Sequence, residues 1–503
     1  MTTKRSMRGF LDLIEKGGNK LPDPWTLFLM MAAGVLLLSA LLSGMAVEVI
    51  SPSDGSTIKI VNLLNPEGIR KIFTEMSKNF ANFPPFAVVL VCMLGIGVAE
   101  KSGLINVTLK KFVTLVPSWL LPATLVFAGV MSNVASDAGY VVLTPLGAVL
   151  FAAFGRHPIA GLTAAFAGVS GGFSANLLLS SLDPMLAGLT TSAAQLVDKN
   201  YSVLPTANYY FMFASTFLIT LVGSFVTTKI VEPRLGEWKP LDSNTADHSQ
   251  ITTKEKSALG WTVGYLFLFA AVVIFMTVPQ DGLLREAGEL KPFYGSIVPL
   301  IMMFFLGAGL VFGLKSGSIK SDRDVSKMMG ETMSSLGGFI ALVFIMSQFV
   351  AFFTWSNIGI VVAIKGAGVL KAIGFTGLPL LFTFIVVTAV LNLFMGSASA
   401  KWAIMAPVFV PMFMLMGYSP ELAQNAYRIG DSVTNIISPL LPYYPIIIAF
   451  ARKYKPDLGV GTLVSLMVPY SIAFLIVWSI LFAVWYMLGL PIGPAAPFFY
   501  QAN

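Results

Sequence analysis

The chain of 503 residues is poor in cysteine, histidine and charge. It contains one cysteine, Cys92, and two histidines, and only 11% of its residues are charged, whereas 56% are hydrophobic. A single cysteine excludes a disulfide within the chain and a cysteine metal site. Soluble domains carry about 25% charged residues, so the composition excludes an ordinary soluble protein and favours a membrane protein.

Several hydrophobic runs are long enough to cross a bilayer, which requires about 20 apolar residues. They lie at 25–46, 207–230, 260–279, 294–314 and 460–489. The first is longer than the hydrophobic region of a signal peptide, and we interpret it as an uncleaved helix. The alternating segments of about ten residues that are typical of a membrane barrel are not evident. We therefore predict an all-α polytopic membrane protein.

The basic residues concentrate in the segments between these runs. Lys and Arg are enriched in cytoplasmic loops near the ends of spans. Segments 4–20, 229–256 and 315–327 each contain four or five of them, and we place all three in the cytoplasm. Segment 280–293 is balanced in charge and the tail 490–503 has no Lys or Arg, so both are expected outside. The basic residues of these loops account for the net charge of +7, so no nucleic-acid partner is required to explain it.

A polar segment of small residues occurs twice in this apolar chain. "VASDAGYVVLTP" at 134–145 corresponds to "GSASAKWAIMAP" at 396–407. Further pairs lie 262 positions apart: Pro145 and Pro407, Pro158 and Pro420, Gly168 and Gly430, Ser170 and Ser432. With the loop assignments above, one copy runs from outside to inside over 84–228. The other runs from inside to outside over 333–490, so the repeats are inverted.

The repeat divides the chain into five parts. They are 1–83, with the N-terminal tail, first transmembrane helix and periplasmic loop; 84–228, the first inverted repeat with hairpin 1; 229–332, a cytoplasmic loop and two linking transmembrane helices; 333–490, the second inverted repeat with hairpin 2; and 491–503, a periplasmic tail. Inverted repeats are typical of secondary transporters, whose sites lie where helices break near the bilayer midplane. We predict that the two polar segments form re-entrant hairpins or broken helices facing one another.

Polar residues at membrane depth are the candidate site residues, because a charge at the centre of a helix costs about 2.5–3.5 kcal/mol on insertion scales. They are Asn133, Asp137, Asn176, Asp183, Asn392, Ser399, Lys401, Trp402, Arg428, Asp431, Asn435 and the nearby Pro439. Arg428 and Asp431 are three residues apart and share a helix face. They are either functional or a structural pair in which each neutralises the other.

Segments 392–411 and 420–445 resemble the AbgT family of p-aminobenzoyl-glutamate transporters, and the resemblance covers nearly the whole chain. The family belongs to a larger group of ion transporters that includes sodium-coupled dicarboxylate carriers. The resemblance implies nine transmembrane helices plus two hairpins, a homodimer in a bacterial inner membrane, and sulfonamide export in some members. The positions that match the family's pathway residues are Asp183, Ser399, Trp402, Pro420, Arg428, Asp431 and Pro439.

The chemistry of such a substrate suits these residues. Arg428 offers a planar fork for a carboxylate, and Lys401 adds a second positive charge. Trp402 is expected to stack on the aromatic ring; the alternative is a tryptophan of the membrane interface. The candidate substrate-binding residues are Ser399, Lys401, Trp402, Pro420, Arg428 and Pro439.

Oxygen-bearing side chains supply a candidate ion-coupling site. Its residues are Asn133, Asn176, Asp183, Asn392 and Asp431. Sodium, which prefers oxygen ligands, is predicted at Asn176, Asp183 and Asn392. The competing coupling ion is a proton on Asp183 or Asp431, and Asp183 has the alternative of a turn residue before Pro184. The chain has no phosphate-binding loop for ATP, so we expect an ion gradient as the energy source and no other cofactor.

Three alternative functions follow from the sequence. "GVSGG" at 168–172 matches the motif of intramembrane serine peptidases, but a serine nucleophile at Ser170 needs a base within hydrogen-bond reach. The two histidines, His157 and His248, both lie in polar loops, which disfavours catalysis. A channel is disfavoured because the chain shows no repeated pore rings. A sodium-coupled carrier of the dicarboxylate type stays open beside the preferred function, ion-driven transport of p-aminobenzoyl-glutamate or related compounds.

Overall fold

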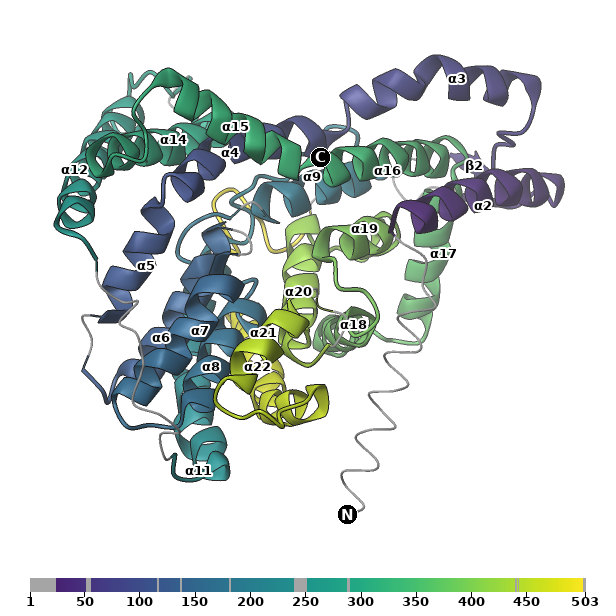
Figure 1. Ribbon diagram of the computed structural model, residues 1–503. Coiled ribbons are helices and arrows are strands. Elements are labelled where there is room, and N and C mark those ends of the chain that lie inside the picture. The colour runs from purple at the N-terminus through teal and green to yellow at the C-terminus, as the bar shows by residue number, and fades with distance from the viewer. Residues whose placement is uncertain are drawn as a thin grey trace.

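The computed structural model is almost entirely helical (Figure 1), which confirms the predicted all-α class. It describes residues 24–50, 56–114, 117–135, 138–180, 182–238, 251–286, 290–438, 441 and 443–500. In these ranges the strands are β1 (Glu48–Ile50) and β2 (Thr57–Lys59), which form one small antiparallel pair.

Seven helices of the described residues are long and apolar enough to cross a membrane. They are α2 (Pro24–Gly44), α12 (Thr253–Thr277), α14 (Ile297–Ser316), α16 (Gly337–Trp355), α19 (Ala398–Leu415), α22 (Val460–Leu488), and α10 (Tyr209–Val226) with its continuation through η3 (Thr227–Val231) and α11 (Glu232–Leu235). The chain is therefore a polytopic membrane protein, as its hydrophobic runs predict.

The same order of helices occurs in both halves of the chain. The first half contains α4 (Pro84–Lys101), α5 (Leu104–Thr114), α6 (Leu121–Ser132), α7 (Ala138–Ala153), α8 (Pro158–Phe166), α9 (Leu182–Ala194) and α10. The second contains α16, α17 (Ile358–Ala372), α18 (Gly377–Asn392), α19, α20 (Pro420–Val433), α21 (Tyr444–Arg452) and α22. Corresponding helices also exchange partners, because α9 packs on α19 and α21 packs on α7. The two halves therefore interlock.

Two helical hairpins, α6 with α7 and α18 with α19, are each interrupted by a polar break between their helices. The 12 residues of α6 span about 18 Å at 1.5 Å per residue, well short of a hydrocarbon core of about 30 Å. The chain breaks after α6 in the 3₁₀ turn η1 (Asn133–Ala135) and resumes as α7. Likewise α18 ends at Asn392 and α19 begins at Ala398. The two repeated polar segments therefore form the hairpin tips and the first turns of α7 and α19. Asp137 lies outside the described residues.

Ring packing and close backbone contact hold these hairpins. In the second hairpin, Phe384 of α18 lies 4.8 Å from Phe409 and 5.1 Å from Phe413 of α19, measured between ring centroids. In the first, α6 approaches the π turn η2 (Ala167–Gly171) so closely that a Cβ on Gly168 would lie 2.2 Å from the carbonyl oxygen of Val126. A side chain there is sterically excluded.

The remaining helices surround this core. Figure 1 shows α20 near the centre, with the α6–α8 region on one side and α18 and α19 on the other. At one end α12 and α14 pack against each other, and α14 packs on α4. The peripheral segments are α3 (Pro66–Ala81), α13 (Lys291–Gly295) and α15 (Asp322–Ser335), and the 3₁₀ turn η4 (Asn435–Ile437) follows α20.

Candidate functional site

The central helix α20 is polar in sequence yet completely buried. Its N-terminus is fixed by Ser419, whose side chain accepts a hydrogen bond from the backbone N–H of Leu422, and by Pro420 in the first turn. All 14 of its residues are buried, among them Glu421, Arg428 and Asp431. Ionisable residues inside a membrane protein usually face a pathway or a partner and mark function, so α20 is the core of the candidate site.

Residues three and four apart on a helix lie on one face, which gives α20 two polar stripes. Glu421, Gln424 and Arg428 form what we call the Arg428 stripe, which faces α9 and the start of α10. The Asp431 stripe consists of Tyr427, Asp431 and Thr434 and faces the hairpin of α18 and α19. One stripe therefore contacts the first half of the chain and the other contacts the second.

Arg428 pairs with a carboxylate from the other half. Its Nη1 lies 2.6 Å from Oδ1 of Asp183 on α9, and both side chains are buried. The second carboxylate oxygen of Asp183 accepts hydrogen bonds from the backbone N–H and the hydroxyl of Ser180, at 2.6 and 2.9 Å. Asp183 thus both caps its turn and carries the ion pair. The hypothesis that Arg428 neutralises Asp431 is wrong for this structure.

Asp431 pairs instead with Lys401 of the second hairpin. The distance from Lys401 Nζ to Asp431 Oδ1 is 2.6 Å, and the side chains are 1% and 2% exposed. Lys401 also donates to Oδ1 of Asn392 and, at 3.3 Å, to the carbonyl of Met395. Asn392 in turn donates to the backbone carbonyl of Asp431 at 2.6 Å. This network fastens the tip of the second hairpin to α20.

Trp402 is fully buried, so the alternative of an interface tryptophan is wrong. Its ring lies 4.4 Å from that of Tyr427, with an angle of 32° between the planes. Its indole N–H donates to Oγ1 of Thr190 at 2.9 Å. In this conformation the aromatic surface of Trp402 therefore covers another residue of the site. Ser399, one turn before it, lies with its hydroxyl 3.4 Å from that of Ser397.

The asparagines of the predicted ion site lie in two places. Asn133 and Asn176 both donate to the carbonyl of Val130, at 3.1 and 3.2 Å. Asn392 lies in the second hairpin, beside Lys401. The side-chain oxygen of Asn176 accepts from the backbone N–H of Leu178. Because this oxygen and those of Asp183 and Asn392 accept protein donors here, a sodium site built from the three stays a prediction.

Several buried polar atoms in this region have no protein hydrogen-bond partner within the described ranges. They are Oδ1 of Asn133, Oγ of Ser170, Oγ of Ser174, Nδ2 of Asn425, Nε of Arg428 and Oδ2 of Asp431. A buried polar atom that stays unpaired costs about 1–3 kcal/mol. The cluster is therefore suited to pair with a polar ligand, an ion or water. Of the two remaining predicted residues, Asn435 accepts a hydrogen bond of 2.8 Å from Asn392, and Pro439 lies outside the described residues.

Sequence patterns missed the residues that connect these groups across the halves. Tyr427 and Gln424 lie in the same polar run as Arg428, and this run is the sequence signal that points to them. Thr190 and Asn208 are single polar residues in apolar surroundings and carry no sequence signal. All four side chains are buried and hydrogen-bonded in the site.

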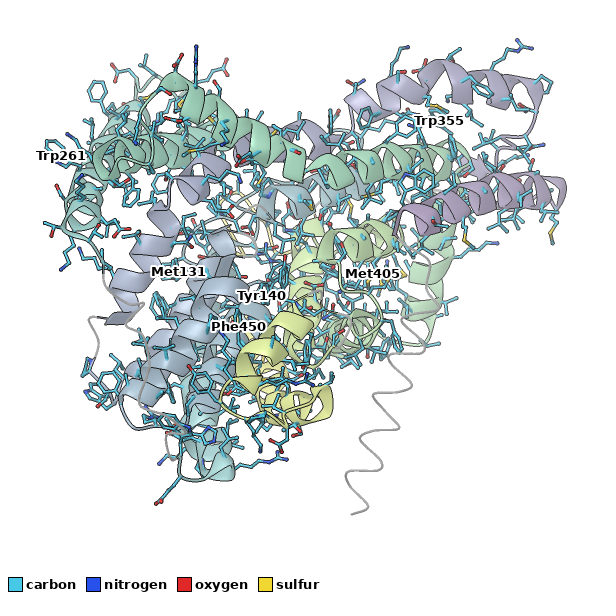
Figure 2. All side chains as sticks on the ribbon, in the orientation of Figure 1. Met131, Tyr140, Trp261, Trp355, Met405 and Phe450 are labelled. Atoms are coloured by element: carbon cyan, nitrogen blue, oxygen red, sulfur yellow. The ribbon has the colours of Figure 1, made fainter. Side chains whose placement is uncertain are left out.

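An apolar cavity of about 500 Å³ adjoins the first hairpin, between that hairpin and the helices α5, α12 and α14. Met131 and Val134 line it at the hairpin tip, and Phe304 and Phe305 line it from α14. In the view of Figure 2, Met131 of α6 and Met405 of α19 lie on either side of α20. The cavity does not include the charged residues of α20, which are closed off by side chains in this conformation.

The geometry disfavours a serine peptidase. Ser170 lies in η2, whereas His157 precedes α8 and uses its Nδ1 to accept from the backbone N–H of Ile159. Thirteen helical residues correspond to about 20 Å, far beyond hydrogen-bond reach of the serine. His248 lies outside the described residues.

Comparisons with known proteins give one consistent result. A sequence model described as the AbgT putative transporter family matches residues 9–500. The p-aminobenzoyl-glutamate transport protein of Escherichia coli (strain K12) is 38% identical over 487 residues, which cover 96% of this chain and 95% of the relative.

Two solved structures are similar over the whole fold. The YdaH transporter of Alcanivorax borkumensis is 44% identical, with a TM-score of 0.90 over 94% of this chain and 100% of its own. MtrF of Neisseria gonorrhoeae, which represents a class of antimetabolite efflux pumps, is 47% identical, with a TM-score of 0.92 over 97% of this chain and 100% of its own.

Proposed function

Because the chain belongs to the AbgT putative transporter family, we propose that it is a secondary transporter of p-aminobenzoyl-glutamate or related aromatic anions and antimetabolites, sulfonamides among them. It acts as a homodimer in a bacterial inner membrane and is driven by a sodium or proton gradient. The observation that carries the proposal is the pair of buried ion pairs on α20, Arg428 with Asp183 and Lys401 with Asp431. Its relatives are transport proteins and efflux pumps, so the protein is a transporter and not an enzyme.

The two cations match the charges of the substrate. p-Aminobenzoyl-glutamate carries two carboxylates and an aromatic ring. Arg428 has five N–H donors and uses Nη1 for Asp183, while its Nε has no hydrogen-bond partner among the described residues. A substrate carboxylate can therefore bind the guanidinium beside Asp183 or in its place. The second carboxylate can likewise bind Lys401 beside Asp431 or in its place. Trp402 and Tyr427 supply aromatic surface next to Lys401 when the ring enters between them.

The two carboxylates offer a way to couple substrate to an ion. Asp183 and Asp431 compete with the substrate for the same cations. A proton or a sodium ion bound to either aspartate neutralises it and weakens its hold on Arg428 or Lys401. The released cation then binds the substrate, so ion and substrate binding favour each other. The Arg428–Asp183 pair joins the two halves, and the Lys401–Asp431 pair fastens the second hairpin to α20. Replacement of these partners by substrate is therefore suited to accompany movement of the hairpins.

Transport by purified protein in proteoliposomes tests the proposal. We expect uptake of radiolabelled p-aminobenzoyl-glutamate that depends on an imposed sodium or proton gradient, applied separately and in both directions. p-Aminobenzoate, which lacks the glutamate carboxylates, is the matched control and should compete weakly. Equal transport of both compounds would remove the role of the second carboxylate, and absence of gradient-dependent transport would contradict the proposed function.

The proposed orientation places the N-terminus in the cytoplasm and the C-terminus in the periplasm. In a Cys92→Ser background, we expect Arg70→Cys and Asp281→Cys to react with a membrane-impermeant thiol reagent added to intact cells. Lys320→Cys and Asp322→Cys should react only after the cells are opened, because a cytoplasmic position is expected for the basic segment 315–327. Labelling of Lys320→Cys in intact cells would contradict the orientation and the inversion of the repeats.

A further inference from the structure

A third buried carboxyl group lies in the same helix, outside the two ion pairs. Glu421, in the first turn of α20, is 3% exposed. Its Oε2 accepts a hydrogen bond of 2.9 Å from the hydroxyl of Tyr201, in the loop between α9 and α10. Asp183 and Asp431 each have a cation within 2.6 Å. Over the described ranges, Glu421 has no lysine, arginine or histidine nitrogen within 4.0 Å.

Among the residues that the structure describes, the ionisable groups around Glu421 provide no counter-charge. The loop contributes Tyr201, Asp198 and Lys199, of which Lys199 lines a separate surface pocket with Lys78 and Ser192. The C-terminal segment contributes Tyr500, whose ring lies 5.8 Å from that of Tyr201. Arg428 lies two turns further along α20, about 10 Å away at the helical rise, and is engaged by Asp183. The other ionisable groups on the packed helices are Lys401 of α19 with Asp431 and Tyr427 of α20, while α18 carries none and α22 only tyrosines.

A chain of hydrogen bonds connects this end of α20 to the aromatic residue of the site. The Trp402 indole donates to Thr190 at 2.9 Å, and the Thr190 hydroxyl lies 2.5 Å from Oε1 of Gln424. Gln424 donates to Asn208 at 2.7 Å, and Asn208 donates to the backbone carbonyl of Glu421 at 2.9 Å. The chain alternates between the halves, because α9 and the loop before α10 belong to the first and α19 and α20 to the second. Any separation of the halves breaks it.

We propose that Glu421 is a proton-binding residue of the transport cycle, protonated while Tyr201 covers it and ionised when the loop 195–208 separates from α20. Burial disfavours the charged form of a carboxyl that has no cation beside it. The N-terminal end of a helix favours a negative charge, but this effect is small compared with the cost of burying an ion. When water reaches Glu421, the O–H bond of the carboxylic acid breaks and its proton passes to that water. This inference rests on the transport function proposed above.

Glu421→Gln tests the proposal, because glutamine keeps the shape of the protonated acid and cannot release a proton. A gradient of one pH unit coupled to one proton supports at most about tenfold accumulation. We expect wild type to accumulate p-aminobenzoyl-glutamate under such a gradient and Glu421→Gln to reach a ratio of about one. Exchange of labelled for unlabelled substrate without a gradient should stay near the wild-type rate. Glu331→Gln is the matched control: it makes the same change at a glutamate that is 49% exposed and outside the site, and it should keep proton-driven accumulation.

Two results would overturn this inference while leaving the proposed function intact: wild-type accumulation that ignores the proton gradient, or accumulation by Glu421→Gln equal to wild type. Parallel loss of exchange and thermal stability in Glu421→Gln would show a structural role and also overturn it. A second measurement needs no substrate. If Glu421 is protonated in the folded protein, wild type in detergent should lose thermal stability relative to Glu421→Gln as the pH rises. Identical pH profiles of the two proteins would contradict the proposal even if the substrate assignment were wrong.

Discussion

Replacing Arg428 by methionine is expected to reduce transport at least about a hundredfold. The substitution leaves Asp183 as a buried carboxylate without its cation, and breaking a buried pair in this way costs about 3–5 kcal/mol. It also removes the guanidinium fork that we assign to a substrate carboxylate. Arg428→Lys should recover little, because an ammonium group does not reproduce the planar, bidentate fork. Radiolabelled uptake and thermal unfolding in detergent measure the two effects separately.

The double variant Arg428→Met with Asp183→Leu separates binding from structure. Replacing both members of a buried pair by apolar residues is often tolerated when removal of one is not. We therefore expect the double variant to regain thermal stability and to stay inactive in transport. If it regained transport as well, Arg428 would serve only to neutralise Asp183, and the proposal of an anionic substrate would lose its main support.

Lys401→Met is expected to have a comparable effect through the second hairpin. One carboxylate oxygen of Asp431 has no hydrogen-bond partner in the part of the chain that the structure describes, and the loss of Lys401 would remove the cation from the other oxygen. Asn392 would lose a donor at the same time, so the hairpin tip would be held less firmly against α20. We expect at least about a hundredfold less transport and a lower unfolding temperature, in line with the cost of an unpaired buried charge.

Two variants complete this experiment. Asp431→Asn removes the charge and keeps the shape, and we expect it to stay folded while losing its dependence on the driving ion; unchanged ion dependence would remove Asp431 from the coupling site. Lys327→Met serves as the control, since Lys327 is 77% exposed and lies 4.0 Å from Glu331. Exposed pairs contribute about 0–1 kcal/mol, so this variant should behave like wild type. A loss in Lys327→Met equal to that in Lys401→Met would indicate a general effect of removing lysines.

The sequence by itself determined the membrane class, the repeat and the positions of the hairpin tips. These features depend on local composition, because an apolar run must span or enter the bilayer and a polar break at that depth must be buried in protein. The length of α6 and the breaks after Ser132 and Asn392 follow from such local patterns. The sequence identifies the polar residues of α20 for the same reason, because placing any one of them in lipid costs free energy whatever its neighbours are.

Only the tertiary structure decided which of these residues pair. Spacing along the helix favoured Arg428 with Asp431, because neighbours on one face are close before any packing is considered. In the folded chain α20 contacts both halves, and Arg428 and Asp431 each pair with a side chain of another helix. Asp183, the partner of Arg428, is 245 residues away in sequence. The partner of Trp402, Thr190, is 212 residues away. Contacts at such separations depend on how the interlocked halves pack, and a periodicity that repeats every few residues carries no information about them.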